Sequence, residues 1–104
     1  MIDEKFVEMF VLMCKTITKP ARLKIIDLID NRKVNVGDLQ KELNIPMSNL
    51  SNHLNDLYRV GLLGKEKRGN YVYYHLKDPE LVEGIARMQE IFKCITANRN
   101  GQGL

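Results

Sequence analysis

Long apolar stripes mark the two ends of the chain. From residue 3 to residue 17, apolar side chains recur at helical spacing and cover more than half of the helix circumference. A last helix begins after Asp78-Pro79, and it carries an apolar stripe of Leu81, Ile85, Met88, Phe92 and Ile95. One small core cannot absorb the wide face of the first helix, so we expect a partner chain to cover it on a second side.

Three shorter helices are predicted between these ends. The sequence ARLKIIDLID forms one of them, with Leu23 and Ile26 facing the core and Thr16 or Thr18 capping its start. After a loop at NRKVNV, the sequence GDLQKEL forms a short helix. The third helix begins at Pro46, because proline is tolerated in the first turn of a helix.

A β-hairpin follows the third helix. The runs LLGKEKR and YVYYHL favour β-strands, and Gly69-Asn70 between them is typical of a hairpin turn. A short helix, a turn, a second helix and a hairpin together make a winged helix-turn-helix. We therefore predict a mainly α fold of about five helices with a two-stranded wing, in a single domain. Its predicted parts are dimerisation helices at 1–17 and 79–96, a helix-turn-helix at 36–62, a wing at 63–77 and a frayed tail at 97–104.

The third helix is poor in strong helix formers. One side of it carries short hydroxyls, amides and one guanidinium, from Ser48, Ser51, Asn52, Asn55 and Arg59. Serine and asparagine disfavour helix interiors, and a surface chosen only for solubility would more often carry lysine and glutamate. Short side chains let a helix approach the major groove of double-stranded DNA and contact base edges and phosphates. The pattern therefore predicts a DNA-reading helix, with a merely solvated helix as the alternative.

Basic side chains of the hairpin strengthen this prediction. The hairpin carries three cations and two polar or aromatic tip residues, namely Lys65, Lys67, Arg68, Asn70 and Tyr71. They lie where a wing would touch the phosphate backbone or the minor groove. The net charge of +3 tolerates an anionic partner but does not require one.

Three segments together resemble the winged helix-turn-helix repressors of the ArsR/SmtB family. They are TKPARLKIIDLID, VGDLQKELNIPMSNLSNHLNDLYRVGLL and KRGNYVYYHL, which lie within about residues 16–78. The resemblance implies a homodimer that binds a palindromic operator and leaves it when a small inducer binds.

The same resemblance assigns roles to single residues. Base-reading positions fall to Ser48, Asn49, Ser51 and Asn52, and wing positions fall to Arg68 and Tyr71. His53 occupies a position where the family often has histidine. Because the helical wheel puts His53 on the apolar side, we expect it to pack there or to bond the neighbouring helix rather than DNA.

The metal-binding boxes of the family are absent from the sequence. Members that sense arsenic, cadmium or lead carry a Cys-Val-Cys-Asp-Leu box, whereas residues 35–39 here read Asn-Val-Gly-Asp-Leu and offer no thiolate. Zinc and nickel sensors place histidine in the last helix, which has none here, and Asp78 with Glu80 alone makes a poor zinc site. We therefore expect no metal and no cofactor, and the inducer stays unidentified.

Cys14 and Cys94 are the two cysteines of the chain. A thiol-sensing branch of the family has a cysteine at about the position of Cys94, but its second cysteine corresponds to Asp27 here. Because the first and last helices meet in this fold, Cys14 and Cys94 together are a candidate thiol sensor. Two unrelated reduced thiols are the alternative.

Other classes of function are disfavoured by what the sequence lacks. It contains no catalytic constellation and no glycine-rich phosphate loop, so we do not expect an enzyme. No stretch approaches the roughly 20 apolar residues of a membrane span, and no signal peptide is found, so we expect a cytoplasmic protein with no membrane partner. Three functions stay open: a dimeric repressor with an inducer, an effector-independent DNA-binding regulator, and a winged-helix module for protein contacts.

Overall fold

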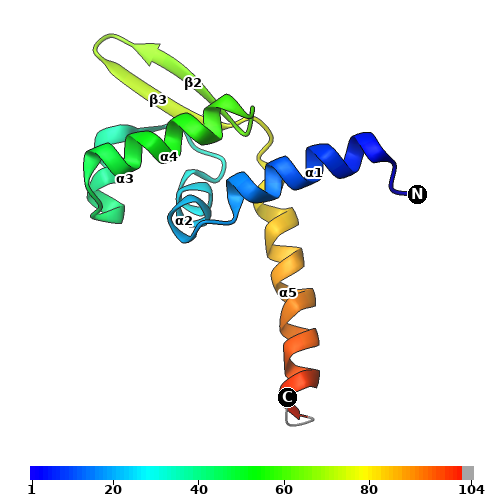
Figure 1. Cartoon of the computed structure of the whole chain (residues 1–104). Helices are drawn as coiled ribbons and strands as arrows, with labels where there is room; N and C mark the ends of the chain where they lie inside the picture. The colour runs from blue at the N-terminus through cyan, green and yellow to red at the C-terminus, as the bar shows by residue number, and fades with distance from the viewer. Residues whose placement is uncertain (102–104) are drawn as a thin grey trace.

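A helix-turn-helix and a small sheet form the body of the molecule, and two helices project from it (Figure 1). The computed structural model describes the backbone of residues 1–101 and the side chains of residues 1–97. Within that range the elements are α1 (Glu4–Ile17), α2 (Pro20–Ile29), β1 (Val34–Asn35), α3 (Val36–Leu43), α4 (Met47–Arg59), β2 (Leu63–Arg68), β3 (Tyr71–Leu76) and α5 (Glu80–Gly101). The predicted fold class, a mainly α winged helix-turn-helix, is confirmed.

The sheet is antiparallel in the order β1-β3-β2, so it has one strand more than the predicted two-stranded wing. β2 and β3 pair around the predicted hairpin turn, with Arg68 opposite Tyr71 and Gly69 at a φ of 59°. Glycine adopts this left-handed conformation without the steric penalty that a Cβ brings. The additional strand β1 lies in the segment predicted as a loop, where Val34 pairs with Tyr74.

The hydrophobic core lies between α2, α3, α4 and the sheet. Its buried apolar side chains are Ile25, Ile26, Ile29, Val34, Leu39, Leu50, Leu54, Leu57, Leu63, Tyr74 and Leu76. Ile26 faces the core as predicted, whereas Leu23 stays 37% exposed. The predicted cap of α2 is wrong, because the hydroxyls of Thr16 and Thr18 donate back to carbonyls of α1 at 2.9 and 2.6 Å. Lys19 precedes α2 and makes no side-chain cap.

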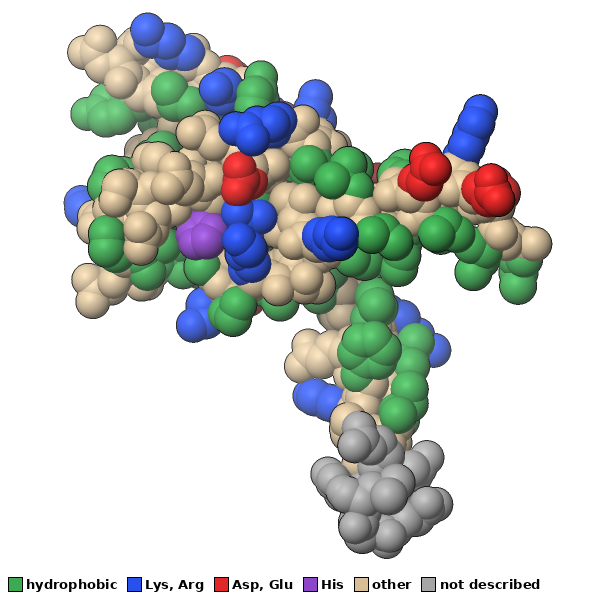
Figure 2. Space-filling model, viewed as in Figure 1, with side chains coloured by type: hydrophobic (Ala, Val, Ile, Leu, Met, Phe, Trp, Pro, Cys, Tyr) green, Lys and Arg blue, Asp and Glu red, His purple; other side chains and the backbone are tan. Residues whose placement is uncertain are grey.

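α1 and α5 extend away from the body (Figure 1), and apolar side chains lie along both (Figure 2). The first turns of α5 pack against the core through Leu81 and Ile85. The large apolar side chains that remain exposed are Phe6, Val7, Met9, Phe10, Val11 and Leu12 on α1 and Met88, Ile91, Phe92 and Ile95 on α5. These are the two helices for which the sequence predicts contact with a partner chain.

The last helix is longer than predicted. α5 continues to Gly101, beyond residue 96, where we expected a frayed tail to follow. Residues 102–104 of that predicted tail lie outside the described range. Over the part of the chain that the structure describes, no helix combines the length and the apolar character needed to cross a membrane.

Candidate nucleic-acid interface

The apolar side of α4 is fixed to the core, and this turns its polar side to solvent. Leu50, Leu54 and Leu57 are fully buried, at the three- and four-residue spacing of one helix face. The predicted base-reading residues lie on the other side of the helix. Of the predicted contact residues on α4, Ser51 is half-buried and the rest are exposed, namely Ser48, Asn49, Asn52, Asn55 and Arg59.

Hydrogen bonds at the α3–α4 turn tie the two helices of the motif together. Asn44 ends α3 in the left-handed conformation, with φ 53° and ψ 48°, and its N–H donates to the Gln40 carbonyl at 2.8 Å. The side-chain amide of Gln40 donates in turn to the Ile45 carbonyl at 3.1 Å. Pro46 then precedes α4, and its ring fixes φ near the value that a helix start requires. The polar side of α4 is therefore held at a defined angle to α3.

One carboxylate, that of Asp56, lies beside the polar side of α4. It accepts from the buried guanidinium of Arg22, and it lies 3.7 Å from Nη1 of Arg59. Opposite charges at this range compensate one another. The outward side of α4 therefore presents no unpaired negative charge to an anionic partner.

His53 is turned away from this outward side. Its Nδ1 accepts from Nε of Arg22 at 3.0 Å, which confirms the expected hydrogen bond to the neighbouring helix, here α2. Burial lowers the pKa of His53 from its usual 6.5, and the positive charges of Arg22 and Lys19 lower it further, against an opposing effect of Asp56. The imidazole is therefore neutral at pH 7.

The wing exposes the side chains that the sequence predicts for DNA contact. These exposed residues are Lys65, Lys67, Arg68, Asn70 and Tyr71. Glu66 lies among them, and its carboxylate accepts from Nζ of Lys33 at 2.8 Å and from Nε of Arg68 at 2.7 Å. The hydrogen bond from Lys33, followed by that from Arg68, lowers the pKa of Glu66 to about 2. The one carboxylate of the wing is thus paired with two cations, and the wing keeps a net positive charge.

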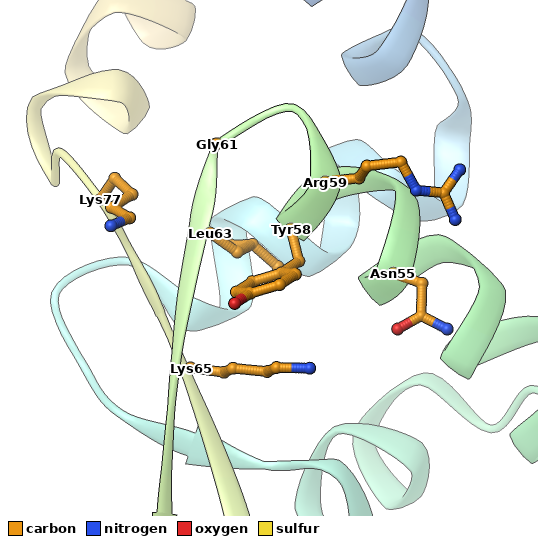
Figure 3. A pocket seen from close by; sticks show the side chains of 7 residues that line it. All are labelled: Asn55, Tyr58, Arg59, Gly61, Leu63, Lys65 and Lys77. Atoms are coloured by element: carbon orange, nitrogen blue, oxygen red, sulfur yellow. The ribbon is translucent and has the colours of Figure 1, made fainter.

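A shallow hollow of about 610 Å³ lies between α4 and the wing (Figure 3). Its lining residues are Asn55, Tyr58, Arg59, Gly61, Leu63, Lys65 and Lys77. Figure 3 shows the Lys65 side chain extending from β2 below the Tyr58 ring, and its Nζ lies 4.3 Å from the ring centroid. The charged residues of this lining are all cations, so the hollow suits an anionic group such as a phosphate.

Sequence reasoning missed three residues of this surface. Tyr58 is 41% exposed beside the fully buried Leu57, and Lys65 of the wing lies over its ring. Lys77 directly follows the last wing strand, so its charge and position could have indicated that it belongs to this surface. Lys33 lies 33 residues from Glu66 in sequence, and no local pattern indicates their pairing.

The candidate sensor residues lie apart from this surface. Cys14 is half-buried on α1, Cys94 is exposed on α5, and both are free thiols.

The ring of His75 packs against Gly64, where an added Cβ would collide with it. Within the described residues, no three His, Cys, Asp or Glu side chains are grouped so that they could hold a metal ion.

Comparison with known proteins identifies close parallels. Residues 19–65 match the family model described as bacterial regulatory protein, arsR family. The chain is 34% identical to the arsenical resistance operon repressor of Bacillus subtilis, over 86% of this chain and 82% of that protein. It is 32% identical to SdpR, a transcriptional repressor of the same organism, over 68% of this chain and 79% of that protein. Among solved structures, HlyU from Vibrio cholerae superimposes with a TM-score of 0.77 at 29% identity, covering 86% of this chain and 98% of the other.

The family match coincides with the DNA-reading motif. Residues 19–65 contain α2, α3, α4 and the start of β2. The two Bacillus subtilis relatives match over most of the chain, so the likeness is not confined to this motif. The family consists of DNA-binding transcriptional regulators, which confirms the expectation that the protein is a regulator and not an enzyme. The chain belongs to the arsR family of bacterial regulatory proteins.

Proposed function

We propose that the protein is a homodimeric repressor that binds a palindromic operator through α4 and the wing. The observation that carries the proposal is the outward side of α4, where short polar side chains lie beside a positively charged wing. Each protomer reads one half-site, with α4 in the major groove and the wing against the backbone or the minor groove. In a bacterial cell this function belongs to the cytoplasm.

Repression is the direction of regulation that the relatives favour. The two Bacillus subtilis relatives, at 34% and 32% identity, are both repressors. HlyU of Vibrio cholerae, at 29% identity, is a transcriptional activator. Release by an inducer stays a prediction of the sequence.

The proposed contacts divide into base edges and phosphates. Hydroxyls and amides that can donate to and accept from bases come from Ser48, Asn49, Ser51, Asn52 and Asn55. Phosphate contacts come from Arg59, Lys65, Lys67 and Arg68, and the wing tip adds Asn70 and Tyr71. The hollow between α4 and the wing takes a further backbone phosphate, which adds Lys77 to the set.

Dimerisation is supported by the exposed apolar faces of α1 and α5. A lone protomer leaves Phe10, Phe92 and their neighbours in water, where apolar surface is unfavourable. A second copy of the chain that packs against both helices would bury them. The same interface would set the distance between the two copies of α4.

The test is fluorescence anisotropy with DNA from upstream of the protein's own gene and with random DNA at equal salt. Ser51→Ala or Asn52→Ala is expected to lose about 1–3 kcal/mol of discrimination, roughly five- to 150-fold, with little change on random DNA. Lys67→Ala is expected to weaken both kinds of binding alike and to reduce the salt slope by about one unit.

Asn31→Ala supplies the matched control. It removes an exposed asparagine in the turn after α2, outside α4 and the wing, and should bind like the wild type. Operator affinity and salt slope that are equal in wild type, Asn52→Ala and Lys67→Ala would reject the proposed DNA contacts.

A further inference from the structure

We propose that Arg22 is a positioning residue for DNA recognition, which locks α4 to the end of α1 only while His53 is neutral. The inference rests on the proposed DNA-binding function and names a residue that does not touch DNA. Arg22 lies on α2 and is 5% exposed, although arginine is among the residues least often buried. Its burial therefore requires partners, and three are present.

The guanidinium of Arg22 reaches two other helices at once. Nη1 donates to the Thr16 carbonyl at 3.0 Å, and this carbonyl lies in the last turn of α1, where helix carbonyls lack partners within the helix. Nε donates to Nδ1 of His53 at 3.0 Å, and Nη2 donates to the carboxylate of Asp56. His53 and Asp56 are both on α4. One planar side chain thus fixes α4 with respect to the end of α1.

Because Arg22 is always charged and is buried, it must keep its hydrogen-bond partners on α1 and α4. Arginine stays protonated in proteins. If Arg22 lost its partners, it therefore could not become neutral and would remain a buried, unpaired cation. A buried ion pair is costly to break, because the remaining charge loses both water and its partner. An apolar residue could fill the same space, but it would not define the angle between α1 and α4.

The hydrogen bond to His53 sets a condition on protonation. Nδ1 can accept from Arg22 only if it carries a lone pair, so the imidazole must be neutral, with its proton on Nε2. A second proton would set an N–H of His53 against the N–H of Arg22. The charged groups that act on His53 are Lys19 and Arg22 at the start of α2 and Asp56 on α4.

The pKa of His53 gives the direction of the pH effect. Burial first, and then Arg22 and Lys19, lowers this pKa below 6.5 in the folded protein. The neutral form therefore stabilises the lock fully above about pH 6.5, and the stabilisation is lost as the pH falls through the lowered pKa. Acid should release α4 from α1.

The position of α4 relative to α1 matters because a dimer must reach two half-sites. Their centres lie about one helical turn of DNA apart, ~34 Å, so the two copies of α4 must be set at that separation. α1 carries part of the proposed dimer face, and α4 carries the base-reading side. Loss of the Arg22 contacts should weaken operator binding. It should spare binding to random DNA, because the cations that hold phosphates are unchanged.

The test is the pH dependence of DNA binding by wild type, His53→Asn and His53→Gln. In asparagine, Oδ1 occupies the place of Nδ1, so it can accept from Arg22 and does not titrate. Glutamine carries its amide one carbon further and leaves that place without an acceptor. The pair therefore separates the hydrogen bond at Nδ1 from the mere presence of a polar side chain.

Operator affinity of the wild type is expected to fall several-fold, roughly three- to tenfold, between about pH 7.5 and a pH below the lowered His53 pKa, which an NMR titration of His53 locates. Protonation of a histidine would ordinarily strengthen DNA binding by adding positive charge, so this sign is distinctive. His53→Asn is expected to show no such fall, and His53→Gln should bind the operator weakly at both pH values. Affinity for random DNA should not fall with acid in any of the three proteins. All three proteins retain His75, so any contribution of that residue is common to them.

Two measurements keep the test decisive. Circular dichroism at each pH checks that the three proteins are folded, and nitrogen NMR of the free protein reports which ring nitrogen of His53 carries the proton. Equal pH profiles for wild type and His53→Asn, or a proton on Nδ1 at neutral pH, would overturn the inference. A wild type that shows no operator preference at about pH 7.5 would instead overturn the proposed function.

Discussion

At the scale of single residues, Glu66 determines how much of the wing's positive charge is available. Its carboxylate binds Lys33 and Arg68, so the Nε of Arg68 is already engaged before the proposed contact with DNA. Lys65 instead lies over the Tyr58 ring. Of the three wing cations, Lys67 has none of these contacts, and it is therefore the cleanest probe of a phosphate interaction.

The pairing of Glu66 makes a prediction about pH. Lys33→Ala should raise the pKa of Glu66 from about 2 toward its usual value of 4.5, since the hydrogen bond from Lys33 is the largest cause of the shift. In the wild type the pairing stabilises the wing above pH 4.5, and this is lost as the pH falls toward about 2. A titration of the Glu66 carboxyl group, followed by NMR, measures this pKa in the wild type and in Lys33→Ala.

Lys67→Ala provides the comparison for that titration. Lys67 is adjacent to Glu66 on β2, and successive side chains of a strand point to opposite faces. The Glu66 pKa should therefore stay near 2 in Lys67→Ala. An unchanged pKa in Lys33→Ala would show that the Lys33 contact does not hold in solution.

Buried polar contacts between distant residues could not be predicted from the sequence. The polar side of α4 was visible because its members recur at helical spacing, and His53 was placed correctly against a neighbouring helix. That the donor would be Arg22 was not visible, because these residues lie 31 positions apart. No local pattern distinguishes Arg22 from the other cations of the chain, and only the packing of α1, α2 and α4 buries it.

At the scale of elements, the α3–α4 turn depends on the backbone conformation of Asn44. Its φ of 53° lies in the left-handed region, which asparagine tolerates and β-branched residues do not. The turn joins the two helices of the DNA-reading motif, so strain there would act on the angle of α4.

Substitution of Asn44 should separate conformation from side-chain chemistry. Asn44→Val is expected to destabilise the protein by about 1–2 kcal/mol, because valine is strained at positive φ. Asn44→Gly is expected to change stability little, because glycine adopts this conformation freely. Urea denaturation measures both, and equal loss in the two variants would mean that the asparagine side chain, rather than the backbone, holds the turn.

Helices with a repeating apolar pattern and the hairpin with its glycine turn were predictable, whereas the two-residue strand β1 was not. α1, α4 and α5 contain enough residues for their apolar spacing to repeat, and the hairpin is marked by its glycine turn. β1 has two residues, and it is a strand only because Val34 pairs with Tyr74 of β3. The residue that caps α2 was predicted wrongly, because the hydroxyls of Thr16 and Thr18 bond back to α1 rather than forward to α2.

At the scale of the whole molecule, the protomer has an extended outline of 55 × 33 × 23 Å. α1 and α5 account for this shape, and both expose apolar faces, including the stacked rings of Phe6 and Phe10, 5.4 Å apart. Such faces are stable in water only when another surface covers them. The proposed dimer would thus contribute to the stability of the fold as well as to its function.

A charge placed on the apolar face of α5 should weaken the dimer. Phe92 is 54% exposed in the protomer, and Phe92→Lys is expected to raise the dimer dissociation constant at least roughly tenfold, because the interface would bury an unpaired cation. Glu90→Lys, on the polar side of the same helix, should leave association nearly unchanged. Sedimentation velocity at micromolar concentration distinguishes the two, and a wild type that sediments as a folded monomer would reject the proposed interface.

The exposed faces of α1 and α5 also bear on how gene expression responds to the amount of this protein. When the protein is scarce and mostly unassociated, the dimer concentration grows with the square of the total concentration, by mass action. An operator that only a dimer can occupy therefore fills over a narrower range of protein level than one that a single protomer could occupy. In the proposed dimeric repressor, the two apolar helices that leave the protomer incomplete would thus convert a gradual rise in protein level into a steep fall in transcription.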